Sequence, residues 1–418
     1  MKVIKYNKVN EKVYYEKLKS GLEVYMYPNK KARNFYITYT IKAGSNILNF
    51  STGKKKYKLV PGTMHFLEHQ MFKEEKGSAF DYFSKLGSSV NAYTTYDNTT
   101  YEVISNNHFK ENLEIMYNFI SNPVFKETSV NKEKSIIEEE IEMYENDIDS
   151  KLLFETEKQL NINDNHKYKI SGEIEDIKKI TKEDLYNAYD AFYNKSNSFI
   201  VITGNFNHLE ALGILKELET NIKVKPYNKP TIKQEKEPIK VNTERKEIIK
   251  NITIPKVMLT YKLDKNKFKS ESNLDIYLDL ILDITFGNTS DFLELITNEN
   301  IIVGDLNYNK EIRNNYIYIS FNFDTFYENQ VIELIDNKLN NLIIKKEELD
   351  MIKRSYKADF IRSFDDIIMI NENITNDILS NNEIKNNIYD IYDKLSLNKI
   401  NNIIKSIKTN IKTICVIK

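Results

Sequence analysis

The sequence predicts an α+β protein built from two similar domains, and three observations lead to this prediction. First, 418 residues are too many for one ordinary domain and suit two. Second, segments with strand and helix patterns are mixed without strict alternation, which is typical of α+β folds. Third, the two halves of the chain pass through a similar order of elements, which indicates a duplication.

The elements of each half follow from hydrophobic periodicity. In the first half, alternating apolar residues predict strands, and longer helical patterns follow them. The strands are expected at 21–28, 34–44, 89–105 and 198–204, with helices between about 109 and 160 and from Lys182. The second half repeats this order, with strands at 256–264, 314–324 and 411–418, a helix at 273–286 and helices from Asn329.

A proline-rich, charged stretch marks the joint between the halves. Four of the seven prolines fall between Pro226 and Pro255, where the apolar pattern is interrupted. We therefore expect a first domain at 1–225, a linker at 226–245 and a second domain at 246–418. All five histidines lie at or before His208, so chemistry that needs imidazole belongs to the first domain.

Composition excludes several classes of protein. The chain has 60 Lys and Arg against 61 Asp and Glu, a formal net charge of −1, so it lacks the basic excess of a dedicated nucleic-acid binder. Its one cysteine, Cys415, permits no intrachain disulfide and fits a reducing compartment. No apolar leader and no run of roughly 18 apolar residues is present. We expect a cytoplasmic protein with no membrane contact.

A metal-binding motif lies in the segment PGTMHFLEHQMFK, which contains His65, Glu68 and His69. Residues four apart share one face of a helix, so both imidazoles can bind the same ion. The order His-x-x-Glu-His is the inverted zincin (inverzincin) arrangement. A zinc ion with three protein ligands keeps a position for water and lowers its pKa. Glu68 would take the proton of that water and pass it to the leaving amine.

The third ligand must come from elsewhere, and the candidate is the glutamate-rich helical segment EKSIIEEEIEMYENDI. The apolar residues expected to face inward are Ile136, Ile137, Ile141, Tyr144 and Ile148. Glu140 lies beside this stripe, whereas Glu138, Glu139 and Glu142 are better placed for solvent. Glu133, two turns earlier on the same face, could orient a metal-binding histidine. Periodicity favours Glu140 without excluding the others.

Together, HFLEH and EKSIIEEEIEMY resemble the active-site signature of the pitrilysin family of zinc peptidases, most closely its mitochondrial-processing-peptidase-like members and their bacterial relatives. The resemblance implies one zinc ion per chain, with Glu140 as a ligand and Glu133 as its support. It also implies that Asn91 and Ala92, in the stretch Asn-Ala-Tyr-Thr, lie on an edge strand that holds an extended substrate by strand addition.

The resemblance implies an architecture as well. Each domain should be a mixed, mostly antiparallel sheet with helices packed on one face, and the two domains should form half of a clamshell chamber. The first domain should bind zinc and the second should be a repeat that does not. Because four such domains close the chamber, the family pattern implies a dimer, either of identical chains or with a related subunit.

One departure from the family concerns its second half, which in many members contributes an Arg and a Tyr to the partner's substrate. The corresponding positions here are Thr297 and Val303. A homodimer would lack this pair unless Tyr308 or Arg313 moved in, whereas a related subunit could supply it. We therefore expect a zinc-dependent endopeptidase or processing peptidase of extended peptides. The alternative is a non-catalytic or partner-dependent structural subunit of a pitrilysin-like heterodimer.

Overall fold

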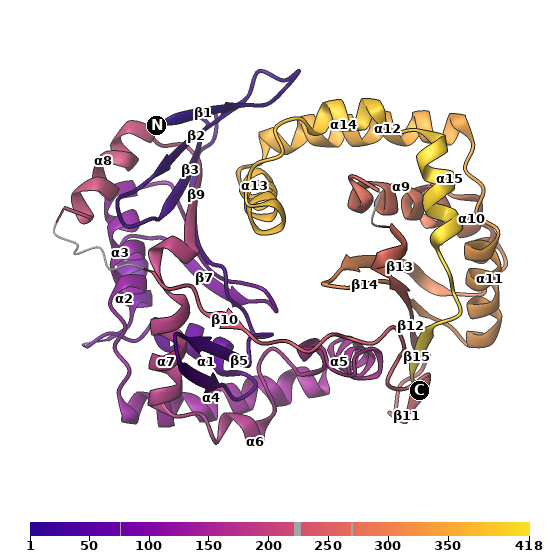
Figure 1. Cartoon of the computed structure of the whole chain (residues 1–418), viewed down its shortest axis with the longest axis horizontal. Coiled ribbons are helices and arrows are strands. Elements are labelled where there is room, and N and C mark those ends of the chain that lie inside the picture. The colour runs from indigo at the N-terminus through magenta and orange to yellow at the C-terminus, as the bar shows by residue number, and fades with distance from the viewer. Residues whose placement is uncertain (76, 221–226, 269–270) are drawn as a thin grey trace. The chain divides into compact units, whose positions relative to one another are not determined.

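A computed structural model describes residues 1–75, 77–220, 227–268 and 271–418, and its contacts divide the chain into two compact units (Figure 1). Unit 1 consists of Met1–Ile141, Lys169–Lys233 and Asp359–Tyr389. Unit 2 consists of Glu142–Tyr168, Gln234–Ala358 and Asp390–Lys418. Each unit has its own sheet and its own helices, so the predicted α+β class with two domains is confirmed.

Unit 1 is built on a mixed seven-stranded sheet. Its strands, in spatial order, are β1 (Lys2–Lys5), β2 (Lys12–Lys17), β3 (Glu23–Pro28), β9 (Ser198–Gly204), β4 (Phe35–Ile41), β8 (Thr99–Ser105) and β7 (Ser89–Thr94). Neighbours are antiparallel except β3 and β9, which are parallel. The run predicted at 89–105 is a hairpin of two strands, and β7 lies at the edge of the sheet.

The remaining elements of unit 1 are a small sheet and a set of helices. The small sheet has the order β10 (Thr231–Ile232), β5 (Asn49–Thr52) and β6 (Lys55–Lys58). The helices are α1 (Thr63–Met71), α2 (Ala79–Lys85), α3 (Phe109–Ser121), α4 (Glu127–Asn146, whose end belongs to unit 2), α6 (Ile174–Ile177), α7 (Lys182–Phe192), α8 (His208–Leu218) and α13 (Ile367–Asn381). Short 3₁₀ turns are η2 (Lys195–Asn197) and η4 (Ser363–Asp365).

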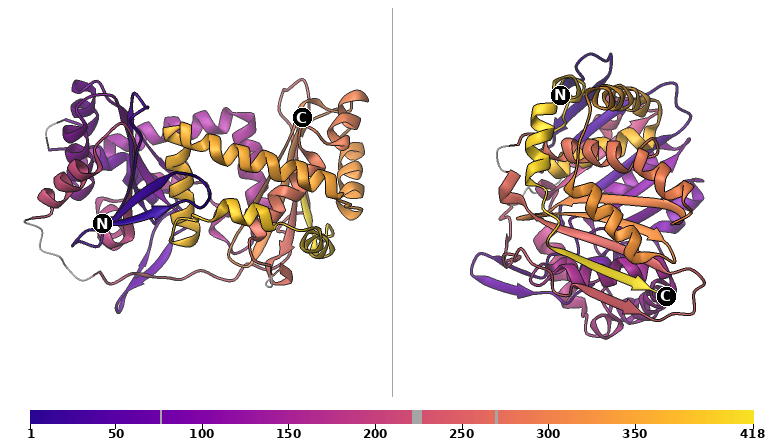
Figure 2. Two further views of the ribbon diagram at one scale, coloured as in Figure 1. Left: turned by 90° about the horizontal axis from the view of Figure 1, so that it is seen from above. Right: turned by 90° about the vertical axis from the view of Figure 1, so that its right-hand side faces the viewer.

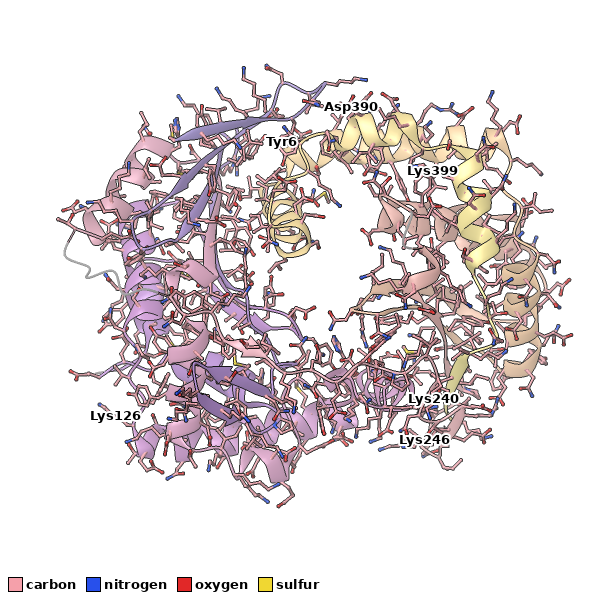
Figure 3. All side chains as sticks on the ribbon, viewed as in Figure 1. Tyr6, Lys126, Lys240, Lys246, Asp390 and Lys399 are labelled. Carbon is pink, nitrogen blue, oxygen red and sulfur yellow. The ribbon has the colours of Figure 1, made fainter. Side chains whose placement is uncertain are left out.

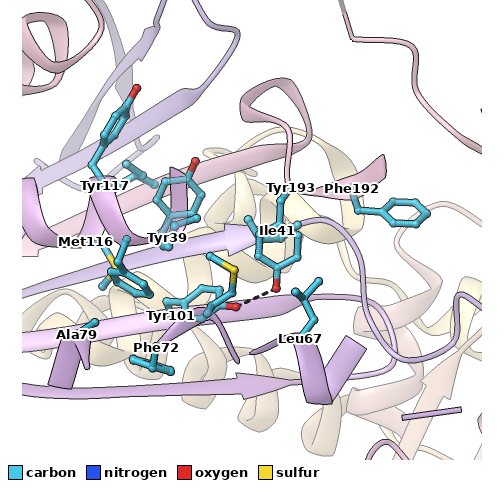
Figure 4. Close-up of a cluster of buried hydrophobic side chains, with 14 of the residues drawn as sticks. Tyr39, Ile41, Leu67, Phe72, Ala79, Tyr101, Met116, Tyr117, Phe192 and Tyr193 are labelled. Atoms are coloured by element: carbon cyan, nitrogen blue, oxygen red, sulfur yellow. Dashed lines mark hydrogen bonds between the residues drawn. The ribbon is translucent and has the colours of Figure 1, made fainter. Parts of the chain in front are cut away.

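Both faces of the seven-stranded sheet are covered, because alternate residues of each strand enter different cores. Val24 of β3 and Ile200 of β9 pack into the core formed with α1, α3 and α7. Figure 4 shows part of this core, where the hydroxyls of Tyr101 and Tyr193 form a hydrogen bond of 2.8 Å. The neighbouring residue Tyr25 packs instead into a second core that contains Ile370, Ile374 and Ile378 of α13.

Unit 2 is built on a five-stranded sheet. Its order is β11 (Arg245–Ile248), β15 (Lys412–Ile417), β12 (Lys256–Asp264), β14 (Tyr316–Asp324) and β13 (Val303–Ile312), and only β11 and β15 are parallel (Figure 2). The helices are α5 (Ile148–Leu160), α9 (Leu274–Phe286), α10 (Asp291–Asn298), α11 (Glu328–Asn340), α12 (Lys346–Arg362, whose end belongs to unit 1), α14 (Ile388–Lys394, whose start belongs to unit 1) and α15 (Leu397–Ser406). Two 3₁₀ turns are η1 (Asn165–Lys167) and η3 (Lys265–Phe268).

The sheet of unit 2 is also covered on both faces. On one face, Phe286 of α9 packs on Phe321 of β14 with ring centroids 4.7 Å apart. On the other face, Leu152 of α5 packs against Met258 of β12 and Cys415 of β15. Lys246 of β11, which is labelled in Figure 3, adds an ion pair of 2.5 Å with Glu155 of α5.

The predicted domain boundaries do not match the compact units. Residues 142–168, predicted in the first domain, belong to unit 2, and residues 359–389, predicted in the second, belong to unit 1. The physical reason is that the apolar faces of α5 and α13 are each buried against the sheet formed by the other half of the sequence. A reading of the sequence in linear order cannot detect such an exchange.

The stretch predicted as a linker at 226–245 is bound to both units where it is described. Residue 226 lies outside the described residues, as do 221–225. Thr231 and Ile232 pair with β5 in unit 1. In unit 2, the Glu237 carboxylate accepts backbone N–H groups of Ile162, Asn163 and Asp164 at 2.6–2.9 Å.

Lys262 of β12 completes this anchor, with its Nζ 2.6 Å from the Glu237 carboxylate. The side chains are 0% and 2% exposed, and burial lowers the pKa of Lys262. Two buried charges that neutralise each other are costly to separate.

Within the described residues, no helix is long and apolar enough to cross a membrane.

We expect Glu237→Gln to lower the free energy of unfolding by about 3–5 kcal/mol, because the change leaves Lys262 buried without a counter-ion. The measurement is chemical denaturation followed by circular dichroism. Glu235→Gln is the matched control, because Glu235 is exposed and should unfold like the wild type. Equal stability of both variants would contradict this account of the anchor.

Candidate metal centre

Helix α1 carries the predicted motif in the interior of unit 1. Its entry needs Gly62, which has a left-handed φ of 88° and approaches Ser171 so closely that a Cβ would lie 2.3 Å from the Ser171 carbonyl oxygen. His65 and His69 lie on the same side of the helix, with ring centroids 4.7 Å apart. His65 and Glu68 are buried, with 8% and 6% of their surfaces exposed.

Helix α4 brings Glu140 to these two histidines. One carboxylate oxygen lies 3.5 Å from Nε2 of His65, and the other lies 3.3 Å from Nε2 of His69. One ligand atom from each of the three residues can be chosen so that all lie within 4.8 Å of one another. Among the described residues, this is the one group of three or more His, Cys, Asp or Glu side chains with that property.

The buried face of α4 differs from the predicted stripe. Its buried residues are Val130, Glu133, Ile137 and Ile141, which follow one another at intervals of three or four. Ile136 and Tyr144, predicted to face inward, are 42% and 38% exposed. The prediction failed there because it weighted apolar character alone, whereas the buried face also carries a charged residue, Glu133.

Glu133, expected to support a metal-binding histidine, lies beside His69. Its carboxylate is 3.1 Å from Nδ1 of His69, and its other oxygen is 2.9 Å from Nζ of Lys73. The contact with Glu133 fixes the ring orientation of His69 and directs Nε2 towards Glu140. Lys73 balances the charge of a carboxylate whose side chain is only 5% exposed.

The charged forms of His69 and Glu140 stabilise each other. Burial opposes the charged form of His69, but hydrogen bonds to Glu133 and Glu140 outweigh it and raise its pKa to about 9. Burial likewise opposes the charged form of Glu140, but hydrogen bonds from both histidines hold its pKa well below the usual range. These shifts favour an anionic Glu140 beside a protonated His69.

Glu68 points to a different neighbour from the histidines. Its carboxylate accepts a hydrogen bond of 2.7 Å from the hydroxyl of Thr94, the last residue of β7. Both residues are buried. Glu68 takes no part in the cluster formed by His65, His69 and Glu140.

Asn91 and Ala92 lie on β7, which pairs with β8 on one side and forms the edge of the sheet on the other. Ala92 and Thr94 point to the same face because they are two residues apart. The side chain of Asn91 is exposed on the opposite face. The strand whose Thr94 binds Glu68 is thus also the edge strand of the described sheet. The role of β7 in substrate binding stays a prediction.

The donor set suits zinc. Two imidazoles and one carboxylate are the ligands of many catalytic zinc sites. Nδ1 of His65 is buried and has no hydrogen-bond partner among the described residues, while its Nε2 faces Glu140. His65, His69 and Glu140 therefore fit a zinc ion, and Glu133 would orient one of the three.

Two profiles of one family match the chain. The profile described as "Insulinase (Peptidase family M16)" matches residues 38–171, which include the whole cluster. The profile described as "Peptidase M16 inactive domain" matches residues 179–356. The chain belongs to peptidase family M16. This result confirms the resemblance to the pitrilysin family.

Relatives of this M16 chain agree in sequence and in fold. It is 32% identical over 373 residues to the uncharacterised zinc protease YmfH of Bacillus subtilis, covering 87% of this chain and 86% of YmfH. It is 27% identical over 214 residues to a mitochondrial-processing peptidase β subunit of Arabidopsis thaliana, covering 50% and 39%. The crystal structure of an M16-like protein from Alicyclobacillus acidocaldarius has the same fold, with a TM-score of 0.90, 22% identity and coverage of 98% and 99%.

Four residues in the described part of the second half bear on the Arg and Tyr that the resemblance led us to expect. Thr297 and Val303 are exposed. The Arg313 guanidinium is buried and forms two hydrogen bonds of 2.9 and 2.7 Å with Glu157. The hydroxyl of Tyr308 donates to Asp283 at 2.8 Å. Both residues suggested as substitutes are therefore engaged within unit 2.

Sequence reasoning missed Thr94, Lys73 and the pair Gln70–Ser129, whose side chains form a hydrogen bond of 2.9 Å between α1 and α4. Thr94 ends the Asn-Ala-Tyr-Thr stretch, so the sequence predicts its place on the strand. The sequence does not predict its hydrogen bond to Glu68. Lys73 lies two residues beyond the end of α1, so helical spacing from His69 does not predict its contact with Glu133. Nothing in the sequence indicates which residue of α4 faces Gln70.

We expect Glu140→Gln to abolish zinc binding, because a neutral amide is a weak zinc ligand. Glu139→Gln, a change to the exposed neighbour, should leave about one zinc per chain. Metal analysis of the purified proteins checks this. Zinc loss in the Glu139 variant with retention in the Glu140 variant would overturn the ligand assignment.

We expect Glu133→Gln to keep the fold and weaken zinc binding by about 10- to 100-fold, because His69 loses its charged hydrogen-bond acceptor. Competition with a chromophoric chelator measures the affinity. Glu142→Gln, on the exposed side of α4, is the control. An unchanged affinity would mean that Glu133 supports the fold and not the metal.

Proposed function

We propose that this M16 protein is a zinc-dependent endopeptidase that hydrolyses extended peptides. The observation that carries the proposal is the convergence of His65, His69 and Glu140. Glu68 lies beside them and accepts a hydrogen bond from Thr94 at the end of the edge strand β7. The zinc protease YmfH supports the same activity class at 32% identity.

In this proposal His65, His69 and Glu140 hold one zinc ion. A zinc ion bound there would act as a Lewis acid, which would polarise the scissile carbonyl and make an attacking water more acidic. Glu133 keeps Nε2 of His69 directed towards the shared site. The chain's own contribution is therefore a fixed set of ligands before substrate arrives.

Glu68 is the general base. The Thr94 hydroxyl donates to one of its carboxylate oxygens, which restricts rotation of the carboxylate and leaves the other oxygen for the proton of the attacking water. The same group then delivers that proton to the leaving amine, so Glu68 is reset at the end of the cycle.

The edge of β7 binds the substrate. An extended peptide adds to this edge as a further antiparallel strand, so that its backbone is recognised and its sequence is read only loosely. Asn91 and Ala92 are the central residues of that edge. Because Thr94 ends the same strand, the position of a peptide along β7 sets its distance from Glu68.

We also propose that the chain works as half of a dimer that encloses the peptide. Thr297 and Val303 stand where the resemblance to the family leads us to expect Arg and Tyr, and Arg313 and Tyr308 form hydrogen bonds within unit 2. These facts favour a heterodimer in which a related subunit supplies the missing groups. They also motivate the second candidate function, a partner-dependent structural subunit whose metal site does not act alone.

We expect Glu68→Gln to retain zinc and to lose roughly a hundredfold to ten-thousandfold of the cleavage rate, the usual contribution of a general base. A quenched-fluorescence peptide library measures cleavage, with and without a related M16 subunit that lacks the motif. Glu139→Gln controls for the loss of a surface charge. If zinc-loaded wild type cleaves nothing under either condition, the peptidase proposal fails and the structural subunit remains.

A further inference from the structure

A cavity of about 150 Å³ lies in unit 2, on the face of the five-stranded sheet that α5 covers. Strands β12, β13 and β14 form its floor, and α5 forms one wall. We call it the Thr260 cavity. Its lining residues are Leu153, Thr156, Glu157, Leu160, Met258, Thr260, Asn307, Tyr308, Asn309, Tyr318, Ser320 and Asn322.

The floor of the Thr260 cavity is a grid of neutral polar side chains. Strand register sets Asn309, Ser320 and Thr260 directly opposite one another across β13, β14 and β12. One row further along, Asn307, Asn322 and Met258 are opposite one another. Thr260 and Asn322 lie in different rows of adjacent strands and are diagonal neighbours, about 7–8 Å apart, so a group that donates at one end and accepts at the other can lie between them.

Two polar atoms of this floor lack partners among the described residues. Oγ1 of Thr260 and Oδ1 of Asn322 are buried, and neither atom has a hydrogen-bond partner there. Thr260 is only 1% exposed. A buried hydroxyl without a partner costs free energy, so these atoms are well suited to a ligand that brings its own donor and acceptor.

The one charged side chain of the lining and two of its hydroxyls are already engaged in hydrogen bonds. Glu157 is neutralised by its two hydrogen bonds from Arg313. The hydroxyl of Tyr318 donates to Glu311 at 2.9 Å, and that of Thr156 donates to the Leu152 carbonyl at 2.8 Å. The cavity therefore offers no free charge, and a charged ligand group would lose its hydration without compensation.

The rest of the wall is apolar. Leu160 and Met258 are buried, and Leu153 stands at the rim with 46% of its surface exposed. A cavity of this volume holds a group about the size of benzene. The ligand group should thus combine a short hydrocarbon stem with a compact neutral head that both donates and accepts hydrogen bonds.

We propose that the Thr260 cavity binds the carboxamide side chain of a glutamine or asparagine residue in a peptide. The amide N–H donates to Oδ1 of Asn322, the amide carbonyl accepts from the Thr260 hydroxyl, and the methylene stem lies against Met258 and Leu160. The peptide context rests on the proposed function, whereas the preference for a carboxamide rests on the cavity alone.

The test uses the full chain with Glu68→Gln, so that no cleavage occurs, and labels its nine methionines with ¹³C-methyl groups. Loss of a signal in Met258→Leu assigns the methyl group at the cavity. The probes are the acetyl-methylamides of glutamine, glutamate and methionine, which share the same backbone. Glutamine should shift the Met258 signal in a saturable way, and glutamate and methionine should not.

Thr260→Val tests the hydroxyl with little change in shape. It should weaken glutamine binding by roughly threefold to tenfold, the usual effect of one neutral hydrogen bond. Because the Thr260 hydroxyl has no partner, the variant should be at least as stable as the wild type. Thr231→Val, an exposed site on β10 in unit 1, is the matched control and should change nothing.

Several results would overturn the proposal. Equal shifts from glutamine and methionine, equal shifts from glutamine and glutamate, or no shift from any probe would each exclude a carboxamide site. Unchanged affinity in Thr260→Val, with or without lost stability, would assign that hydroxyl a structural role. Since binding is measured without hydrolysis, failure here leaves the Glu68 experiment unaffected, and a wild type that cleaves no peptide leaves this result standing.

Discussion

The seam between α1 and α4 is the contact on which the candidate metal centre depends. The two helices run in opposite directions and meet through polar pairs: Gln70 with Ser129, His69 and Lys73 with Glu133, and both histidines with Glu140. A single helix can present two imidazoles but not a third ligand at the same point. The seam supplies that ligand, and its buried polar groups tolerate little sliding because each would lose its partner.

Support for the base is separate from support for the metal ligands. Glu68 shares α1 with both histidines, yet its partner is Thr94 on β7 and not a residue of α4. A disturbance of α4 would therefore act first on metal affinity, and a disturbance of β7 would act first on the base. Because β7 is also the proposed substrate edge, peptide binding and base orientation share one strand.

Local chemistry was predictable from the sequence, whereas long-range packing was not. The four-residue spacing of His65 and His69 required one helical face, and the resemblance selected Glu140, which the structure brings to them. The stripe through Ile136 and Tyr144 was wrong because burial on α4 follows Glu133, whose charge is balanced by Lys73. The segments 142–168 and 359–389 belong to the opposite units from those expected, because chain order does not reveal which sheet covers α5 or α13.

The crossing of the chain between its two units has a consequence for any division of this gene. A break within 227–245 would leave the apolar face of α5 on the N-terminal piece, although Met258 and Cys415, which cover it, are on the other. The C-terminal piece would keep Ile370, Ile374 and Ile378 of α13 without their sheet. Each fragment would expose an apolar surface that only the other fragment can bury, so the two fragments would have to associate in order to fold. The tandem halves behave as interlocked parts and not as separable modules.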